Sequence, residues 1–136
     1  MAEKLLHHVS LVSKNLEASA AFYAEVLELS EVKRPEFPVP GRWFRSGTVE
    51  VHLIGKQDGT FRPKSSIDHN DIHFAIRVPD FEVEVSRLKA LGYYEEEEAK
   101  GGEKLLRINR HGKAGYPQVF LVDPDHHVIE INAERI

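Results

Sequence analysis

Hydrophobic and polar residues alternate one by one in four short stretches of the chain. These stretches are residues 8–12, 48–54, 73–78 and 126–132. Successive side chains of a β-strand point to opposite faces, so this period of two predicts four strands. In the first stretch Val9 and Leu11 share one face, and His8 and Ser10 share the other. Each predicted strand therefore has an apolar face suited to a core and a polar face.

Apolar residues at helical spacing follow the first and the third of these strands. Asn15 and Asp80 come directly before the two helical patterns, and both residue types are favoured as helix N-caps. Gly92 follows the second pattern and is typical of a helix C-terminus. The apolar positions are Leu16, Phe22, Tyr23, Val26, Leu27 and Leu29 in the first helix and Phe81, Val85, Leu88 and Leu91 in the second.

The chain contains an internal repeat, which predicts two similar structural units. Residues 8–17 align without a gap with residues 73–82 at an offset of 65. Residues 48–54 resemble residues 126–132 at an offset of 78. Each half therefore reads as a strand, a helix and three further strands. The remaining strands are expected at about 31–34, 42–46, 93–97 and 117–122, with an extra strand near 105–110.

The expected fold class is α+β, with two βαβββ modules that form a curved mixed sheet around a concave polar face. The modules cover about residues 5–55 and 71–134 of one domain that comprises residues 1–136. Residues 56–70 are polar and contain Gly and Pro, so they are expected to be the linker. The two amphipathic helices would cover the apolar faces of the strands.

Residues that can bind metal ions occupy the polar faces of the four strands. The repeat makes His8 equivalent to His73, and it makes His52 equivalent to Glu130. If the polar faces converge, three imidazoles and one carboxylate meet, a donor set that suits a divalent transition metal. It includes the two-His-one-carboxylate arrangement of non-haem iron. The alternative is that each is an ordinary solvated or hydrogen-bonded polar residue, which is the commoner role of a single His or Glu on a strand.

Composition and charge narrow the classes of partner. The chain has 136 residues, of which 41% are hydrophobic and 29% charged, as in a soluble globular domain. Its net charge of −4 and the absence of a basic block argue against nucleic acid and acidic membrane surfaces as partners. There is no cysteine, so disulfides and thiolate nucleophiles are excluded. With no signal-peptide pattern and no long apolar run, a cytoplasmic location is expected.

Six stretches of the chain carry a family resemblance: LHHVSLV at 6–12, NLEASAAFYAEVLEL at 15–29, VHLI at 51–54, DIHFAIRV at 71–78, LKALGY at 88–93 and DPDHHVIEIN at 123–132. Together they resemble the vicinal oxygen chelate superfamily, which includes glyoxalase I, bleomycin-resistance proteins, fosfomycin-resistance transferases and extradiol dioxygenases. The resemblance implies paired βαβββ modules, a metal ion on the concave face and a homodimer. It places the metal ligands on His8, His52, His73 and Glu130.

The chain departs from the pattern of that superfamily at two positions. His52 stands where glyoxalase I enzymes tend to have Glu, which leaves Glu130 as the one carboxylate among the inferred ligands. His126 stands where a Gly usually follows the DPD motif. His7 precedes the matching position and has the wrong parity for a ligand. A convincing set of glutathione-binding residues is not recognisable.

The expected function is that of a metal-dependent enzyme acting on a small substrate with vicinal oxygens, as an isomerase, lyase or dioxygenase. The metal would be Ni, Zn, Fe or Mn. Glu130 and Glu50 are the catalytic candidates; Glu50 lies on the same face as His52, about 7 Å along the strand. Candidates to orient an anionic substrate are Arg77, Arg107, Tyr116 and Gln118. The alternative is a non-catalytic drug-binding or small-molecule-binding protein of the bleomycin-resistance type.

Overall fold

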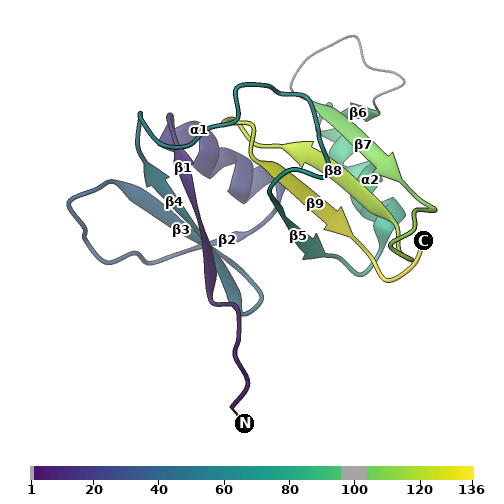
Figure 1. Ribbon diagram of the computed structural model, residues 1–136, viewed down its shortest axis with the longest axis horizontal. Coiled ribbons are helices and arrows are strands. Elements are labelled where there is room, and N and C mark those ends of the chain that lie inside the picture. The colour runs from purple at the N-terminus through teal and green to yellow at the C-terminus, as the bar shows by residue number, and fades with distance from the viewer. Residues whose placement is uncertain (1, 96–103) are drawn as a thin grey trace. The chain divides into compact units, whose positions relative to one another are not determined.

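The computed structural model describes residues 2–95 and 104–136, and the chain divides into two compact units, Met1–Phe61 and Arg62–Ile136 (Figure 1). Each unit has its own sheet, of four strands in the first and five in the second. No helix within the described residues combines the length and the apolar character that crossing a bilayer requires.

The first unit is built on a sheet with the strand order β1-β4-β3-β2. The strands are β1 (His8–Ser13), β2 (Ser30–Val32), β3 (Gly41–Ser46) and β4 (Val49–Gly55). β1 and β4 are parallel, and the other neighbours are antiparallel. A parallel pair needs a long crossover connection, and the helix and the β2–β3 hairpin between β1 and β4 supply it. The register places His8 opposite Glu50 and Ser10 opposite His52.

The helix of the first unit begins as expected and then widens. α1 (Leu16–Ala21) starts after Asn15, whose side chain accepts a hydrogen bond from the backbone N–H of Ala18. It continues as a single π-helical segment, η1 (Phe22–Val26), in which the N–H of Leu27 reaches back to the carbonyl of Phe22. Phe22 and Tyr23 are both buried, at 6% and 0% exposure. Periodicity predicted the helix here but not its wider turn.

The second unit is built on a sheet with the strand order β5-β9-β8-β7-β6. The elements are β5 (His73–Arg77), α2 (Phe81–Ala90), β6 (Tyr94–Glu95), β7 (Leu105–Asn109), β8 (Gln118–Val122) and β9 (Val128–Asn132). β5 and β9 are parallel, as β1 and β4 are in the first unit. The side chain of Asp80 caps α2, and Gly92 has a positive φ of 98° just after the helix. Residues 96 and 97 of the strand expected at 93–97 lie outside the described residues.

The strand expected near 105–110 is present as β7, but the sheet order corrects the expectation that it is the additional strand of this unit. β7 pairs antiparallel with β8, just as β2 pairs with β3, so β7 is the counterpart of β2. The additional strand is the two-residue β6, which pairs parallel with β7. The reason is that the eight-residue segment 110–117 joins β7 to β8 as a hairpin, and hairpin partners pair before more distant segments.

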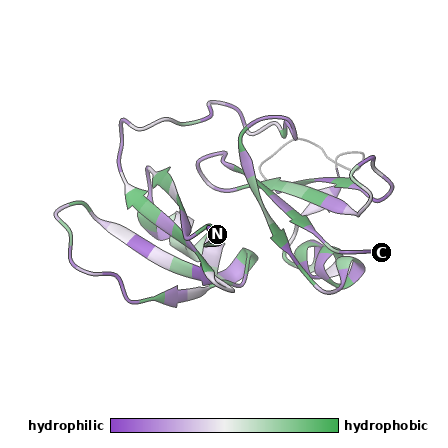
Figure 2. Ribbon diagram, turned by 60° about the horizontal axis from the view of Figure 1, so that its bottom comes forward, coloured by the Kyte–Doolittle hydropathy of each residue, from purple (hydrophilic) through white to green (hydrophobic). Residues whose placement is uncertain are grey.

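The core of the second unit lies on the face of the sheet that α2 covers (Figure 1). α2 buries Phe81, Val85 and Leu88, and the strands bury Leu106, Val119, Leu121, Ile129 and Ile131 on the same side. The alternation of hydrophobic and hydrophilic residues along the strands is visible in Figure 2. Because every second residue enters this core, the residues between them form the opposite, polar face.

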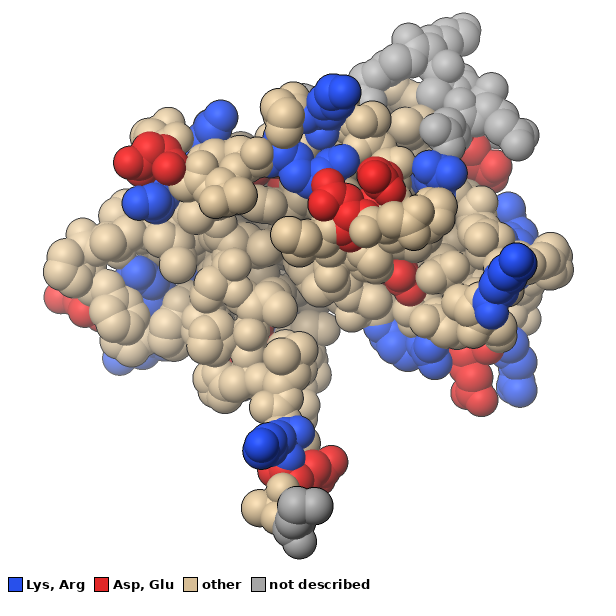
Figure 3. All heavy atoms as spheres, in the orientation of Figure 1, with Lys and Arg blue, Asp and Glu red and all other residues tan. Residues whose placement is uncertain are grey.

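Charged side chains are mixed on the face of the molecule that Figure 3 shows. Lys and Arg residues lie beside Asp and Glu residues on this face. Ion pairs among the described residues include that of Arg110 with Glu82 at 2.6 Å.

Candidate metal centre

The first unit brings two of the predicted ligands, His8 and His52, into contact. Their rings are stacked, with centroids 4.1 Å apart and planes inclined by 16°. The other face of His52 is covered by Trp43 on β3, at 3.9 Å and 6°. His52 is 7% exposed, whereas His8 lies on the exposed edge strand. The stack holds the His52 ring in one plane.

Glu50 orients His52 from within the same strand. Its Oε1 lies 2.9 Å from Nε2 of His52, and its Oε2 accepts a hydrogen bond of 2.9 Å from Arg45. The hydrogen bond from His52, followed by that from Arg45, lowers the pKa of the Glu50 carboxyl below its usual value. Because an ionised carboxylate only accepts, Nε2 of His52 is the donor and Nδ1 carries the lone pair. A carboxylate that fixes the tautomer of a histidine is a common support for a metal ligand.

His7 contacts His8, although it is not on the ligand side of the strand. The two Nδ1 atoms are 2.8 Å apart, so one ring donates and the other accepts. With Nδ1 of His8 as the donor in this contact, Nε2 of His8 carries the lone pair that a metal ion would need. His7 itself contacts His8 on its Nδ1 side.

The second unit brings together the other two predicted ligands, His73 and Glu130. Nδ1 of His73 lies 2.8 Å from the backbone carbonyl of Asp71, which can only accept, so Nδ1 carries the proton. In the neutral ring Nε2 then presents a lone pair, and it lies 3.3 Å from Oε1 of Glu130. Two acceptors at this distance are unfavourable unless a proton or a metal cation lies between them. As a pair of metal ligands, this nitrogen and this oxygen fit a divalent metal ion.

Glu130 is held by side chains of the polar face. It is only 4% exposed, and its Oε2 accepts a hydrogen bond of 2.6 Å from Nδ2 of Asn132. Asn132 in turn accepts from Nε of Arg77 on β5. The amide and the guanidinium compensate part of the cost of burying the carboxylate. They also leave Oε1 directed at His73.

Asn132 is therefore expected to affect metal binding without touching the metal. Replacing it with Leu, which has a similar shape, removes the hydrogen bond to Glu130 and should lower Ni²⁺ affinity about 10-fold to 100-fold. Calorimetric titration of the metal-free protein measures this change. Asn70→Leu, an exposed substitution, is the control, and equal affinities for the two variants would contradict the role of Asn132.

A third group of potential ligands lies in the turn between β8 and β9. Single donor atoms of Asp123, Asp125 and His127 all lie within 4.8 Å of one another. Oδ1 of Asp123 accepts hydrogen bonds of 2.9 Å from the backbone N–H groups of Asp125 and His127. Asp123 thereby builds the turn that starts β9. The D-x-D-x-H spacing was available in the sequence as a signal for this group.

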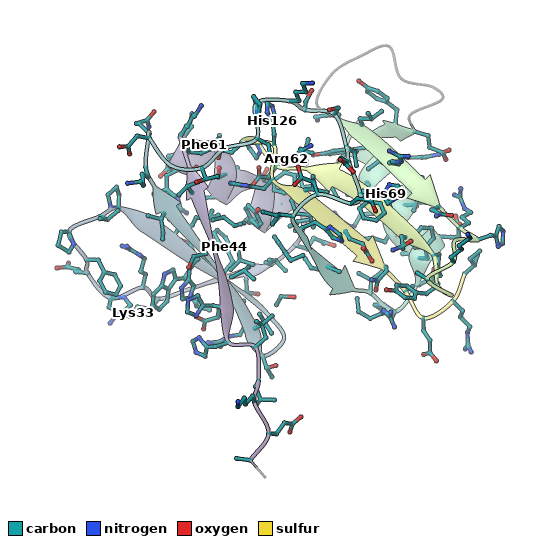
Figure 4. The ribbon with its side chains drawn as sticks, in the orientation of Figure 1. Lys33, Phe44, Phe61, Arg62, His69 and His126 are labelled. Atoms are coloured by element: carbon teal, nitrogen blue, oxygen red, sulfur yellow. The ribbon has the colours of Figure 1, made fainter. Side chains whose placement is uncertain are left out.

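The turn also accounts for His126, which stands where the resemblance led us to expect Gly. His126 has a φ of 68°, the left-handed region that Gly adopts most easily. Arg62 stabilises this conformation, because its Nη1 donates to the carbonyl of His126 at 2.8 Å (Figure 4). Nδ1 of His126 lies 3.1 Å from the carbonyl of Arg62. His126 therefore helps to hold the turn before β9 through its contacts with Arg62.

Several solved structures share the fold of this protein. The structure resembles lactoylglutathione lyase from Agrobacterium tumefaciens, with a TM-score of 0.68, 20% identity and coverage of 98% of this chain and 96% of that one. It also resembles the fosfomycin resistance protein FosX from Listeria monocytogenes, with a TM-score of 0.69, 17% identity and full coverage of both chains. At these identities the likeness shows the fold.

The sequence then assigns the family. The profile of the Glyoxalase/Bleomycin resistance protein/Dioxygenase superfamily matches residues 5–131, and the chain belongs to this superfamily. Glyoxylase I 4 from Arabidopsis thaliana is 27% identical over 128 residues, which cover 93% of this chain and 68% of that protein. Membership confirms the family and fold that the sequence predicted.

Proposed function

We propose that the protein is a metal-dependent, glyoxalase-like enzyme that acts on a small substrate with two adjacent oxygens. The observation that carries the proposal is the contact of Nε2 of His73 with Oε1 of Glu130, a buried carboxylate, at 3.3 Å. The orientation of His52 by Glu50 and Trp43 supports the same conclusion. The similarity to a lactoylglutathione lyase and to Glyoxylase I 4 favours lyase or isomerase chemistry over that of a dioxygenase.

The proposed metal ligands are His8, His52, His73 and Glu130. The internal repeat makes the pair His8 and His52 equivalent to the pair His73 and Glu130. We therefore assign both pairs to the proposed metal centre, which would bind Ni, Zn, Fe or Mn. When bound, such an ion supplies Lewis acidity to substrate oxygens and stabilises the negative charge that develops on them. Three neutral imidazoles and one carboxylate leave a net positive charge for this purpose.

Glu130 and Glu50 are the proposed proton-transfer groups. A Glu carboxyl is ionised at neutral pH, which is the state that a general base requires, and the hydrogen bonds from His52 and Arg45 lower the pKa of Glu50 further. The same lowering makes Glu50 a weak base, so it suits only a substrate proton whose acidity has been raised by the neighbouring cation. Its hydrogen bond to His52 places it close to the site of that charge.

The proposal includes one glyoxalase-like domain over residues 1–136, a small-molecule substrate, a homodimeric assembly and a cytoplasmic location. The proteins that share the fold include a lyase and a fosfomycin resistance protein, both named for small molecules.

Metal uptake is the direct test of the proposed function. Protein stripped with a chelator and titrated with Ni²⁺, Zn²⁺, Mn²⁺ or anaerobic Fe²⁺ should bind at least one of them stoichiometrically. A ligand at 100 times its Kd stabilises the folded state by about 2.7 kcal/mol, so the melting temperature should rise with metal and fall again with chelator. Failure to take up any of the four ions would contradict the proposal. For protein that does bind Fe²⁺, oxygen consumption with a catechol would separate a dioxygenase from an isomerase or lyase.

Non-catalytic binding of a planar drug is the second candidate function. The stack of Trp43, His52 and His8 favours it, because aromatic faces bind flat or cationic ligands. Phe37 extends this aromatic group, with its ring centroid 6.1 Å from that of Trp43. Binding of an aromatic drug that survives removal of all metal would support this function over the enzymatic one.

A further inference from the structure

A pocket of about 220 Å³ opens on the polar face of the five-stranded sheet. Its lining residues all belong to the second unit: His69, Arg107, Ile108, Asn109, Gln118 and Phe120. Arg107 and Asn109 lie on β7, and Gln118 and Phe120 lie opposite them on β8. The pocket is thus built on two paired strands, which fix the positions of its side chains.

Phe120 connects the pocket to the proposed metal ligands. In the sheet register it lies between Arg107 on β7 and Glu130 on β9. Its ring centroid is 5.7 Å from that of His73 and 5.7 Å from that of His69. Neighbouring strands are about 4.8 Å apart, so the backbone of Arg107 lies about 10 Å from that of Glu130, across two strand spacings. The pocket therefore adjoins the ligand pair without including it.

The chemistry of the lining selects for negative charge. Among the described residues that line the pocket, Arg107 carries a positive charge and none carries a carboxylate. Asn109, Gln118 and His69 add neutral groups that can donate hydrogen bonds. Nη1 of Arg107 donates to the carbonyl of Ile67 at 3.1 Å, which fixes the orientation of the guanidinium. A planar, oriented guanidinium binds a carboxylate through two parallel hydrogen bonds.

We propose that this pocket binds the carboxylate end of an anionic substrate, with Arg107 as the specificity-determining residue. The proposal rests on the proposed function and narrows its substrate class. The substrate carries its charged end remote from the vicinal oxygens, because the pocket and Glu130 are separated by two strand spacings. Small neutral dicarbonyls and simple catechols lack this end and would leave the pocket unfilled.

The test uses two small probes of the same shape, butyrate and its neutral amide butyramide, followed by nuclear magnetic resonance. In metal-free full-length protein, butyrate should shift the side-chain amide resonances of Asn109 and Gln118, and butyramide should bind at least 10-fold more weakly. Inorganic phosphate is the third probe and distinguishes a phosphate site from a carboxylate site. Equal binding of butyrate and butyramide, or tighter binding of phosphate, would overturn the proposal.

Variants of two arginines complete the test. Arg107→Met should weaken butyrate binding at least 10-fold, and Arg107→Lys, which keeps the charge but not the planar fork, should weaken it less. Arg110→Met is the matched control, because Arg110 pairs with Glu82 and is not part of this pocket; it should bind butyrate as the unmodified protein does. If Arg107→Met unfolds through loss of the bond to Ile67, the probe comparison in the unmodified protein still decides. Unchanged butyrate affinity in a folded Arg107→Met would refute the proposal.

Failure of this inference and failure of the proposed function give different results. Arg107→Met should keep its Ni²⁺ affinity, because Arg107 is not a proposed ligand. Butyrate binding in a protein that takes up no metal would leave the pocket standing and remove the metal centre. Metal binding without selective butyrate binding would support the metal centre and refute the carboxylate pocket.

Discussion

Replacing Glu130 with Gln is expected to reduce Ni²⁺ affinity by at least about 100-fold. Substitutions that only support a ligand typically cost 10-fold to 100-fold, and Glu130 is a proposed ligand itself. It is also the one carboxylate of the proposed ligand set, so the substitution removes the negative charge that this set would provide. Gln keeps the size of the side chain and an oxygen for the amide of Asn132, so the fold should persist. Calorimetric titration measures the affinity.

Two comparisons make the Glu130 result specific. Glu134→Gln removes a carboxylate from the exposed C-terminal segment and should leave Ni²⁺ affinity unchanged. Circular dichroism of Glu130→Gln should match that of the unmodified protein, which excludes unfolding as the cause. Native affinity in a folded Glu130→Gln would show that the buried carboxylate serves only the hydrogen bond from Asn132.

The strands and helix starts could be predicted because their signals are local. Asn15 and Asp80 each cap a helix with a side chain that reaches only three residues ahead. Alternation along β4 and β9 separates His52 and Glu130 from their apolar neighbours, and parity needs no knowledge of the partner strand. The first and last strands of each half lie side by side in the sheets. The side chain of His8 therefore contacts that of His52, and the side chain of His73 contacts that of Glu130.

The interactions that the sequence did not reveal depend on neighbouring strands. Asn132 shares the face of Glu130, but its hydrogen bond needs the side-chain geometry and the support of Arg77, 55 residues away. The position of β6 at the sheet edge depends on which strand forms the hairpin with β8. The tautomer of His73 depends on the carbonyl of Asp71, a backbone atom that carries no sequence signal.

The two units present different chemistry from equivalent positions. In the first, His52 is confined between two rings and directed by Glu50, so its contribution is a neutral nitrogen of fixed orientation. In the second, a buried carboxylate faces the lone pair of His73. In the proposed metal centre the second pair would provide the negative charge and the first pair a neutral nitrogen, so loss of the carboxylate is expected to be the more severe. The resemblance led us to expect Glu at the position of His52, and a His there changes the charge of the proposed ligand set while its place on the strand stays the same.

His8→Ala is expected to weaken metal binding about 100-fold or more, and His7→Ala by about 10-fold or less. His8 is a proposed ligand, stacked on His52 at 4.1 Å, whereas the exposed side chain of His7 contacts His8 on its Nδ1 side. A support of this kind affects affinity at the low end of the range for such residues. Absorption spectra of the Co²⁺-loaded protein measure both, since loss of a nitrogen ligand changes the visible bands and loss of a support does not. Equal affinities and identical spectra for the two variants would place His8 outside the metal centre and would reverse the assignment of faces on β1.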